Sequence, residues 1–162
     1  TTKAMKKSIL PAIGIGYLYI IFGNIVSNFL AQILSGAFDI PQGEAINQQV
    51  IIAALRSDGV ILMMIAAVLI GPIVEELIFR KAIFGLITKD SVALIVSSAI
   101  FGAIHLIGET SIESAIVNGI PYFIMGFVFG YIYLKNDRNI WIPIIVHVLS
   151  NLISIIGILI FY

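Results

Sequence analysis

Long runs of apolar residues dominate the chain, and short polar segments separate them. A transmembrane helix needs about 20 mainly apolar residues. The runs are too long and too continuously apolar for the alternating strands of a membrane barrel. Five stretches qualify as spans: Ser8 to Leu34, Gly59 to Ile87, Val92 to Ile107, Ala115 to Leu134 and Ile140 to Tyr162. The pattern therefore predicts an all-α, polytopic membrane helix bundle of about five transmembrane helices.

The composition agrees with a membrane location. Of the 162 residues, 60% are hydrophobic and only 11% are charged, whereas roughly a quarter of the residues of a soluble domain are charged. The net charge is zero without any basic block, which argues against a nucleic-acid partner. The chain has no cysteine, which excludes disulfides, thiol nucleophiles and thiolate metal sites. Membrane lipid is the expected surrounding, and the oligomeric state is not predicted.

The basic residues predict an orientation. Eight of the nine lie before the first run, at the end of the second, or between the fourth and fifth: Lys3, Lys6, Lys7, Arg80, Lys81, Lys89, Lys135 and Arg138. The segments at the other ends of the runs are acidic, and Arg56 is their only basic residue. Positive residues favour the cytoplasmic side. We therefore expect the N-terminus inside and the C-terminus outside.

No linker or internal repeat divides the chain, so we expect one integral membrane domain. Residues 1–58 would form an N-terminal transmembrane helix and an external loop, and residues 59–162 a core of four transmembrane helices. Pro41 and Gly43 interrupt the loop. Residues 46–56 are either a short helix on the outer membrane surface or an ordered loop. Gly126 and Gly130 form a small-xxx-small pattern that predicts close helix packing.

A few polar residues stand inside the apolar runs. Charges at bilayer depth are costly and usually mark a functional site. The candidates are Glu75, Glu76 and Arg80 in the second run, His105 in the third, and His147 and Asn151 in the fifth. At a rise of about 1.5 Å per residue, these groups reach similar depths in the membrane. Six groups on three runs at one depth favour a site over isolated polar contacts that hold the bundle together.

Helical spacing relates these residues to one another. Glu76 and Arg80 are four residues apart and can pair. Glu75 is rotated by about 100° from Glu76 and can point elsewhere. His147 and Asn151 share one face of a helix by the same spacing.

The residue types suit hydrolysis by water. Glu75 beside His105 could hold and deprotonate a water molecule, because burial makes a carboxyl group a better base. His147 and Asn151 offer donors for the oxyanion that forms when water attacks an amide carbonyl. Zinc bound by Glu75, His105 and His147 is an open alternative, since one Glu and two His form a common zinc triad. If zinc is not used, the reaction requires no cofactor.

Three motifs carry a family resemblance. They are Glu75-Glu76-x-x-x-Arg80, Phe101-x-x-x-His105 and His147-x-x-x-Asn151, in this order over about residues 60 to 155. They resemble the motifs of the CPBP intramembrane endopeptidases. That family takes in CAAX prenyl proteases of the Rce1 type and bacterial Abi proteins linked to bacteriocin processing and immunity. A single run precedes the core here, whereas family members often carry more, which fits a fragment or a short member.

The resemblance implies a role for each motif residue. It implies a glutamate-type peptidase in which Glu75 and His105 activate water. His147 and Asn151 would stabilise the oxyanion, while Glu76, Arg80 and Phe101 would support the site. The implied substrate is a membrane-associated peptide or protein.

Two other functions remain open. A non-catalytic scaffold or bacteriocin-immunity protein could keep the motifs and act by binding. Proton- or ion-coupled transport is disfavoured because five runs show no inverted repeat. Frequent isoleucine and asparagine indicate a bacterial source, for which prenylated substrates are not expected. The predicted location is the bacterial cytoplasmic membrane, with the site opening toward the cytoplasm.

Overall fold

Helices make up nearly all of the part of the chain that the structure describes, and no strand occurs there. The structure, a computed structural model, describes the backbone of residues 2–40 and 43–161 and the side chains of residues 9–40 and 43–161. The segments are α1 (Thr2–Phe38), α2 (Ile46–Leu55), α3 (Val60–Ile65), a π-helical segment (Ala66–Ile70), α4 (Gly71–Glu76), a second π-helical segment (Leu77–Ala82), α5 (Ile83–Leu86), α6 (Asp90–His105), α7 (Ile112–Lys135) and α8 (Trp141–Phe161). The predicted all-α bundle is confirmed.

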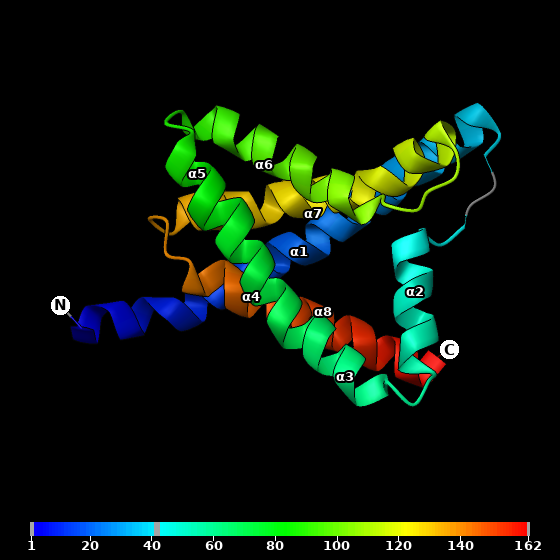
Figure 1. Ribbon diagram of the computed structural model, residues 1–162. Helices are drawn as coiled ribbons and strands as arrows, with labels where there is room; N and C mark the ends of the chain where they lie inside the picture. Colours follow the sequence, from blue (N-terminus) through cyan, green and yellow to red (C-terminus); the bar gives the residue numbers. More distant parts are fainter. Residues whose placement is uncertain (1, 41–42, 162) are drawn as a thin grey trace.

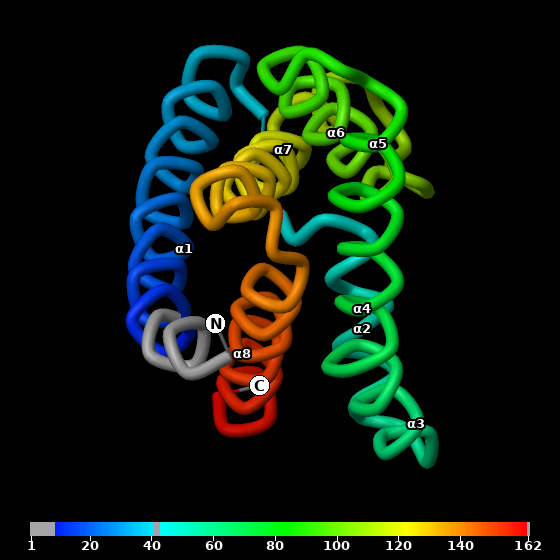
Figure 2. The backbone as a smooth tube through the Cα atoms, turned by 90° about the vertical axis from the view of Figure 1, so that its left-hand side faces the viewer, coloured from blue at the N-terminus to red at the C-terminus, as the bar shows by residue number. Residues whose placement is uncertain are grey.

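The helices form one bundle in which α3, α4 and α5 are parts of a single long helix. α1 and α8 run in the same direction and α7 runs against them (Figure 1). α6 lies along α7, and α1 contacts both α7 and α8. The long helix, Val60–Leu86, crosses α8, and α2 joins its start to the end of α1 (Figures 1 and 2). Residues 46–55 are thus a helix, the first of the two predicted alternatives, while Pro41 lies outside the described residues.

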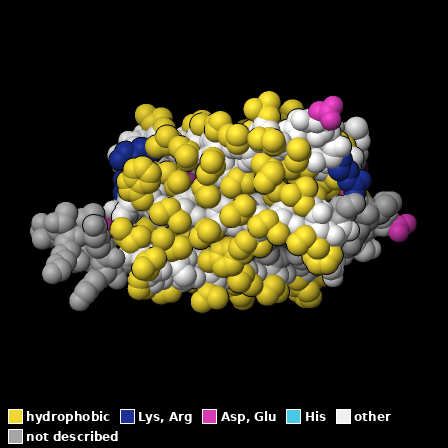
Figure 3. Space-filling view, turned by 90° about the horizontal axis from the view of Figure 1, so that it is seen from below, with side chains coloured by type: hydrophobic (Ala, Val, Ile, Leu, Met, Phe, Trp, Pro, Cys, Tyr) yellow, Lys and Arg dark blue, Asp and Glu magenta, His cyan; other side chains and the backbone are white. Residues whose placement is uncertain are grey.

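Four helices of the described chain are long and apolar enough to cross a membrane, where five spans were predicted. They are Ile9–Phe38, Val60–Leu86, Ile112–Lys135 and Trp141–Phe161. The remaining predicted span is α6, which has 16 residues and is therefore about 24 Å long. That is shorter than the roughly 30 Å hydrocarbon core. Hydrophobic side chains cover most of the face seen in Figure 3, and charged side chains gather toward its ends.

Polar contacts join the loops at each end of the bundle. An ion pair between Arg138 and Asp90 links the α7–α8 loop to the start of α6. At the other end, the Glu109 carboxylate accepts hydrogen bonds from the Ile46 backbone N–H at 2.9 Å and from Asn118 Nδ2 at 3.2 Å. The loops thus alternate between two ends as the charge pattern predicted.

One of the basic residues used to predict the membrane orientation does not lie at an end of the helix bundle. Arg80 is fully buried, so the argument rests on the remaining basic residues of the same group. The side chains of Lys3, Lys6 and Lys7 lie outside the described residues. Which end faces the cytoplasm stays a prediction.

Glycines let α6 and α7 approach closely, as the Gly126/Gly130 pattern predicted. A Cβ atom on Gly126 would lie 3.1 Å from the Ser98 Cα and 3.2 Å from the Phe101 Cβ. A Cβ on Gly130 would lie 2.5 Å from a methyl group of Leu94. These contacts leave no room for a side chain between the two helices.

Replacing Gly126 by alanine is expected to destabilise the protein by about 1–3 kcal/mol, because the added methyl overpacks the contact between α6 and α7. Thermal unfolding of the purified protein measures this effect. Gly157→Ala is the matched control, since a Cβ there meets nothing within 4 Å and alanine is the better helix former. Equal melting temperatures for the two variants would show that close packing at Gly126 is not required.

Candidate active site

The seven residues of the three motifs come together around one cavity of about 920 Å³. Five of them line it: Glu75, Phe101, His105, His147 and Asn151. Glu76 and Arg80 are fully buried and lie behind this wall. The predicted convergence of the long helix, α6 and α8 is confirmed.

Glu76 is the centre of a buried polar network. Its Oε2 lies 3.1 Å from Arg80 Nε, and neither side chain has any exposed surface. Its Oε1 lies 2.9 Å from His147 Nδ1. A carboxylate paired with a guanidinium accepts hydrogen bonds, so His147 donates from Nδ1 and its Nε2 faces away from Glu76. The predicted Glu76–Arg80 pair is confirmed, and His147 joins it.

Arg80 contacts α7 and two aromatic rings as well as Glu76. Its Nη2 donates to the Gly126 carbonyl of α7 at 2.9 Å. The guanidinium carbon also lies 5.0 Å from the centre of the Phe101 ring and 5.4 Å from that of Phe129, within cation–π range. These contacts tie the long helix to α6 and α7 and fix the position of Glu76.

Glu75 points to a different place from its neighbour. Its side chain is 25% exposed, and its Oε2 lies 3.8 Å from His147 Nε2. The sequence paired Glu75 with His105, whereas the structure brings it next to His147. One histidine therefore contacts both glutamates, Glu76 through Nδ1 and Glu75 through Nε2.

His105 is the last residue of α6, and its ring is fixed on both faces. It lies 4.6 Å from the Phe101 ring and 4.6 Å from the Tyr122 ring, nearly parallel to the latter. Its Nδ1 lies 2.7 Å from the Phe101 carbonyl oxygen. Since a carbonyl can only accept, Nδ1 carries a proton, and the neutral form of this ring has its lone pair on Nε2.

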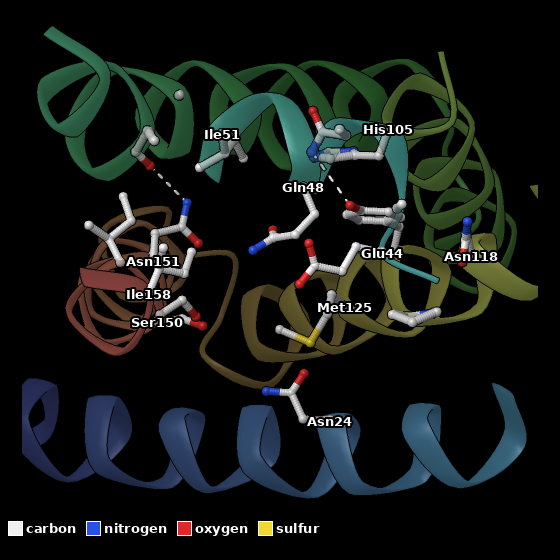
Figure 4. Close-up of a pocket in the computed structure, with 18 of the residues that line it drawn as sticks. Asn24, Glu44, Gln48, Ile51, His105, Asn118, Met125, Ser150, Asn151 and Ile158 are labelled. Carbon is white, nitrogen blue, oxygen red and sulfur yellow. Dashed lines mark hydrogen bonds between the residues drawn. The ribbon is translucent and has the colours of Figure 1, made fainter. Parts of the chain in front are cut away.

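Asn151 is engaged with a distorted part of the long helix. The Gly71 N–H donates to the Ala66 carbonyl five residues earlier, the spacing of a π-helix. The next such bond would need an N–H on Pro72, which proline lacks. The Ala67 carbonyl accepts from Asn151 Nδ2 instead, at 2.8 Å, a bond drawn in Figure 4. One N–H of the Asn151 amide remains for the cavity.

The cavity extends from Glu75 toward α2, away from the α5–α6 and α7–α8 loops. Its walls come from the C-terminal half of α1, from α7 between Val117 and Phe129, and from α8 between His147 and Ile158. Glu44 and Gln48 point into it from the α2 side (Figure 4). The cavity therefore extends toward the end of the bundle opposite to the basic loops, and the cytoplasmic opening stays a prediction.

Other residues of the site were not predicted from the sequence. Tyr122 stacks on His105, and Phe129 stacks on His147 at 4.2 Å. Nothing in the sequence marks these two aromatic residues among many others. A polar wall on the first helix was also missed, although its signal was present as amides at four-residue intervals: Asn24, Asn28 and Gln32.

The zinc alternative requires Glu75, His105 and His147 to converge. Each histidine has only Nε2 left as a ligand atom, because Nδ1 is hydrogen-bonded. Among the residues with described side chains, no three His, Asp or Glu groups lie close enough to hold a metal ion together. The donors as placed do not fit a three-ligand zinc site.

Comparisons with known proteins agree with the motif resemblance. The chain is 34% identical over 153 residues to a Bacillus subtilis protein named "Putative membrane peptidase YdiL", covering 90% of this chain and 57% of that protein. It is 30% identical over 155 residues to the membrane-embedded CAAX protease MroQ of Staphylococcus aureus, covering 92% of this chain and 58% of that protein. The chain thus spans little more than half the length of these relatives. No solved structure was found to match it.

The family model that matches is described as type II CAAX prenyl endopeptidase Rce1-like, and it covers residues 57–153. This range contains all seven motif residues and more than half of the chain. The chain therefore belongs to the Rce1-like family of membrane peptidases.

Proposed function

We propose that the chain is an intramembrane endopeptidase in which Glu75 activates water for direct attack on a peptide bond. The observation that carries this proposal is the contrast between two adjacent carboxylates. Glu76 is fully buried and ion-paired, whereas Glu75 is partly exposed to the cavity. A general base must reach both water and substrate, and Glu75 is the one that can.

The first step is the activation of water. A water molecule in the cavity donates one hydrogen bond to the Glu75 carboxylate and the other to Nε2 of His105, whose Nδ1 proton is held by the Phe101 carbonyl. Glu75 takes a proton as the water oxygen bonds to the carbonyl carbon of the substrate. The protein forms no covalent bond to the substrate in this scheme.

The second step is the stabilisation of the oxyanion. The remaining N–H of Asn151 and a proton on His147 Nε2 serve as donors. A doubly protonated His147 balances the charges of the cluster, because two glutamates then face one imidazolium and one guanidinium. Glu75 returns the proton to the leaving nitrogen as the C–N bond breaks, so the products are a carboxylic acid and an amine.

The direct test is a comparison of new peptide termini, by mass spectrometry, in membranes of cells that make the wild-type chain or an equally abundant Glu75→Gln variant. Termini present only with the wild type establish proteolysis and identify the substrate. The comparison is repeated with 1,10-phenanthroline, which should not remove those termini if no zinc takes part. Identical termini in both samples would instead favour a non-catalytic binding protein.

We further infer that the basic end faces the cytoplasm, so that the cavity opens on the outer side of the membrane. The chain has no cysteine, and single cysteines therefore report on sidedness without background. Gln49→Cys on α2 is expected to react with a membrane-impermeant maleimide in intact cells, whereas Lys135→Cys reacts only after permeabilisation. The reverse pattern would restore the cytoplasmic opening that the sequence predicted.

A further inference from the structure

α1 carries a row of carboxamides that the proposed reaction does not use. Asn24, Asn28 and Gln32 lie within a span of mean hydropathy 1.9. Four residues advance a helix by about 400°, so side chains at this interval share one face. All three border the cavity, and Asn24 points into it in Figure 4.

These amides have no partner in the part of the chain that the structure describes. Each carboxamide offers two N–H donors and one acceptor oxygen, yet the side chains of Asn24, Asn28 and Gln32 hydrogen-bond to no described residue. Ser27, on the same helix, shows the contrast, because it is buried and bonds to the Asn24 carbonyl at 3.0 Å. Amides left open in an apolar span are costly unless a polar occupant satisfies them.

The opposite wall of the cavity carries a further amide, Gln48, beside the carboxylate of Glu44. Gln48 of α2 points inward from the side opposite Asn24 in Figure 4, and its side chain also has no hydrogen-bond partner among the described residues. Glu109 fixes this wall by accepting hydrogen bonds from the first residue of α2 and from α7. The cavity thus presents neutral amides on two sides, with the carboxylates of Glu44 on the α2 side and Glu75 at its inner end.

The spacing of the row matches an extended peptide. Successive amides lie about 6 Å apart along the helix axis, from four residues at 1.5 Å each. In an extended chain, main-chain groups on one side repeat every two residues, or about 6.6 Å. Three amides therefore cover about four substrate residues. The volume of about 920 Å³ is at the upper end of ligand pockets and accommodates such a segment.

We propose that Asn24, Asn28 and Gln32, with Gln48 opposite, form a subsite that binds the main chain of an extended peptide on its way to Glu75. This inference rests on the proposed peptidase function and adds how the substrate is held. Neutral amides read the peptide backbone and not a side-chain charge, so binding tolerates many sequences. The three α1 residues precede the segment that the family model covers, residues 57–153.

The test measures binding apart from cleavage. A fluorophore-labelled random twelve-residue peptide library is titrated into nanodisc-embedded protein carrying Glu75→Gln, so that nothing is cleaved, and the fluorescence anisotropy is followed. Replacing Asn24, Asn28 and Gln32 by leucine on this background should raise the Kd at least tenfold. A library with N-methylated peptide bonds lacks main-chain N–H donors. It should bind the Glu75→Gln protein with intact amides as weakly as the unmethylated library binds the triple leucine variant.

Two matched controls separate the subsite from general damage to α1. Phe22, Phe29 and Ile33 are exposed on the same helix, and replacing all three by leucine should leave the Kd unchanged. Exchanging the amides among themselves, by Asn24→Gln, Asn28→Gln and Gln32→Asn, should retain binding within about threefold. Melting temperatures establish that each variant is folded.

The outcomes distinguish the two proposals. An unchanged Kd in the triple leucine variant, with cleavage by the wild type still dependent on Glu75, overturns the subsite alone. Amide-dependent binding without any cleavage by the wild type overturns the peptidase function alone. If the Glu75→Gln protein with the intact amides binds no peptide, the subsite proposal is also overturned.

Discussion

Replacing Glu75 by glutamine is expected to lower the rate of peptide-bond cleavage by a factor of about 10²–10⁴, the usual contribution of a general base. Glutamine has nearly the same shape but cannot take a proton from water. The fold should survive, because the side chain is 25% exposed and its closest charged partner is His147 at 3.8 Å. Partly exposed ion pairs contribute no more than about 1 kcal/mol. Cleavage of the substrate found through its new termini, measured with purified proteins, gives the rate, and thermal unfolding gives the stability.

Glu113→Gln is the matched control for this experiment. Glu113 is an exposed glutamate in the first turn of α7 and lies outside the cavity, so its replacement should leave the rate unchanged. If the Glu75 variant keeps more than half of the wild-type rate while folded, Glu75 is not the base. The bound water would then need another acceptor, and Nε2 of His105 is the group with a free lone pair.

The parts of the site that depend on local helix geometry could be predicted from the sequence. The Glu76–Arg80 pair follows from a spacing of four residues, and the structure confirms it with an Oε2–Nε distance of 3.1 Å. The divergence of Glu75 from Glu76 follows from the rotation of about 100° per residue. Both statements need only one helix, so neither depends on how the helices pack.

The contact between Glu75 and His147 could not be predicted in the same way. The contact depends on the orientation of the long helix about its own axis relative to α8. An estimate of depth in the membrane does not determine this orientation. The orientation is also altered by the two π-helical segments on either side of Gly71–Glu76, since each wide turn shifts the register of the residues beyond it. Only Pro72 hints at this distortion in the sequence, because it cannot donate to the Ala67 carbonyl.

The polar wall was missed for a different reason, and the helix of the third predicted span, α6, is shorter than the other four. Charged residues and histidines led to the candidates, and Asn151 was included because it shares a helix face with His147. The amides of the first helix have no charged residue or histidine four residues away. Segment length was also judged from apolar character, so a run of 16 residues was counted as a span although α6 is shorter than the hydrocarbon core. For the amides, the missing information is the tertiary position of the first helix relative to the cavity.

Replacing Glu76 by glutamine is expected to destabilise the protein by about 3–5 kcal/mol, the cost of breaking a buried ion pair from one side. Glu76 and Arg80 have no exposed surface, so the guanidinium would be left buried without its counter-charge. His147 would also lose the carboxylate that accepts from its Nδ1 at 2.9 Å. A large fall in the melting temperature of Glu76→Gln, beside a small one for Glu75→Gln, is the expected result.

The double variant Glu76→Gln/Arg80→Met separates an unpaired charge from a general loss of packing. Methionine is apolar and flexible enough to fill the space left by Arg80, and removing both charges takes away the desolvation cost that the single variant leaves. The double variant should therefore be more stable than Glu76→Gln, although less active than the wild type because His147 no longer faces a carboxylate charge at Nδ1. Equal melting temperatures for Glu75→Gln and Glu76→Gln would refute the assignment of Glu76 to support and Glu75 to chemistry. A double variant less stable than the single one would show that Arg80 stabilises the bundle mainly through its bond to the Gly126 carbonyl and its contacts with the aromatic rings.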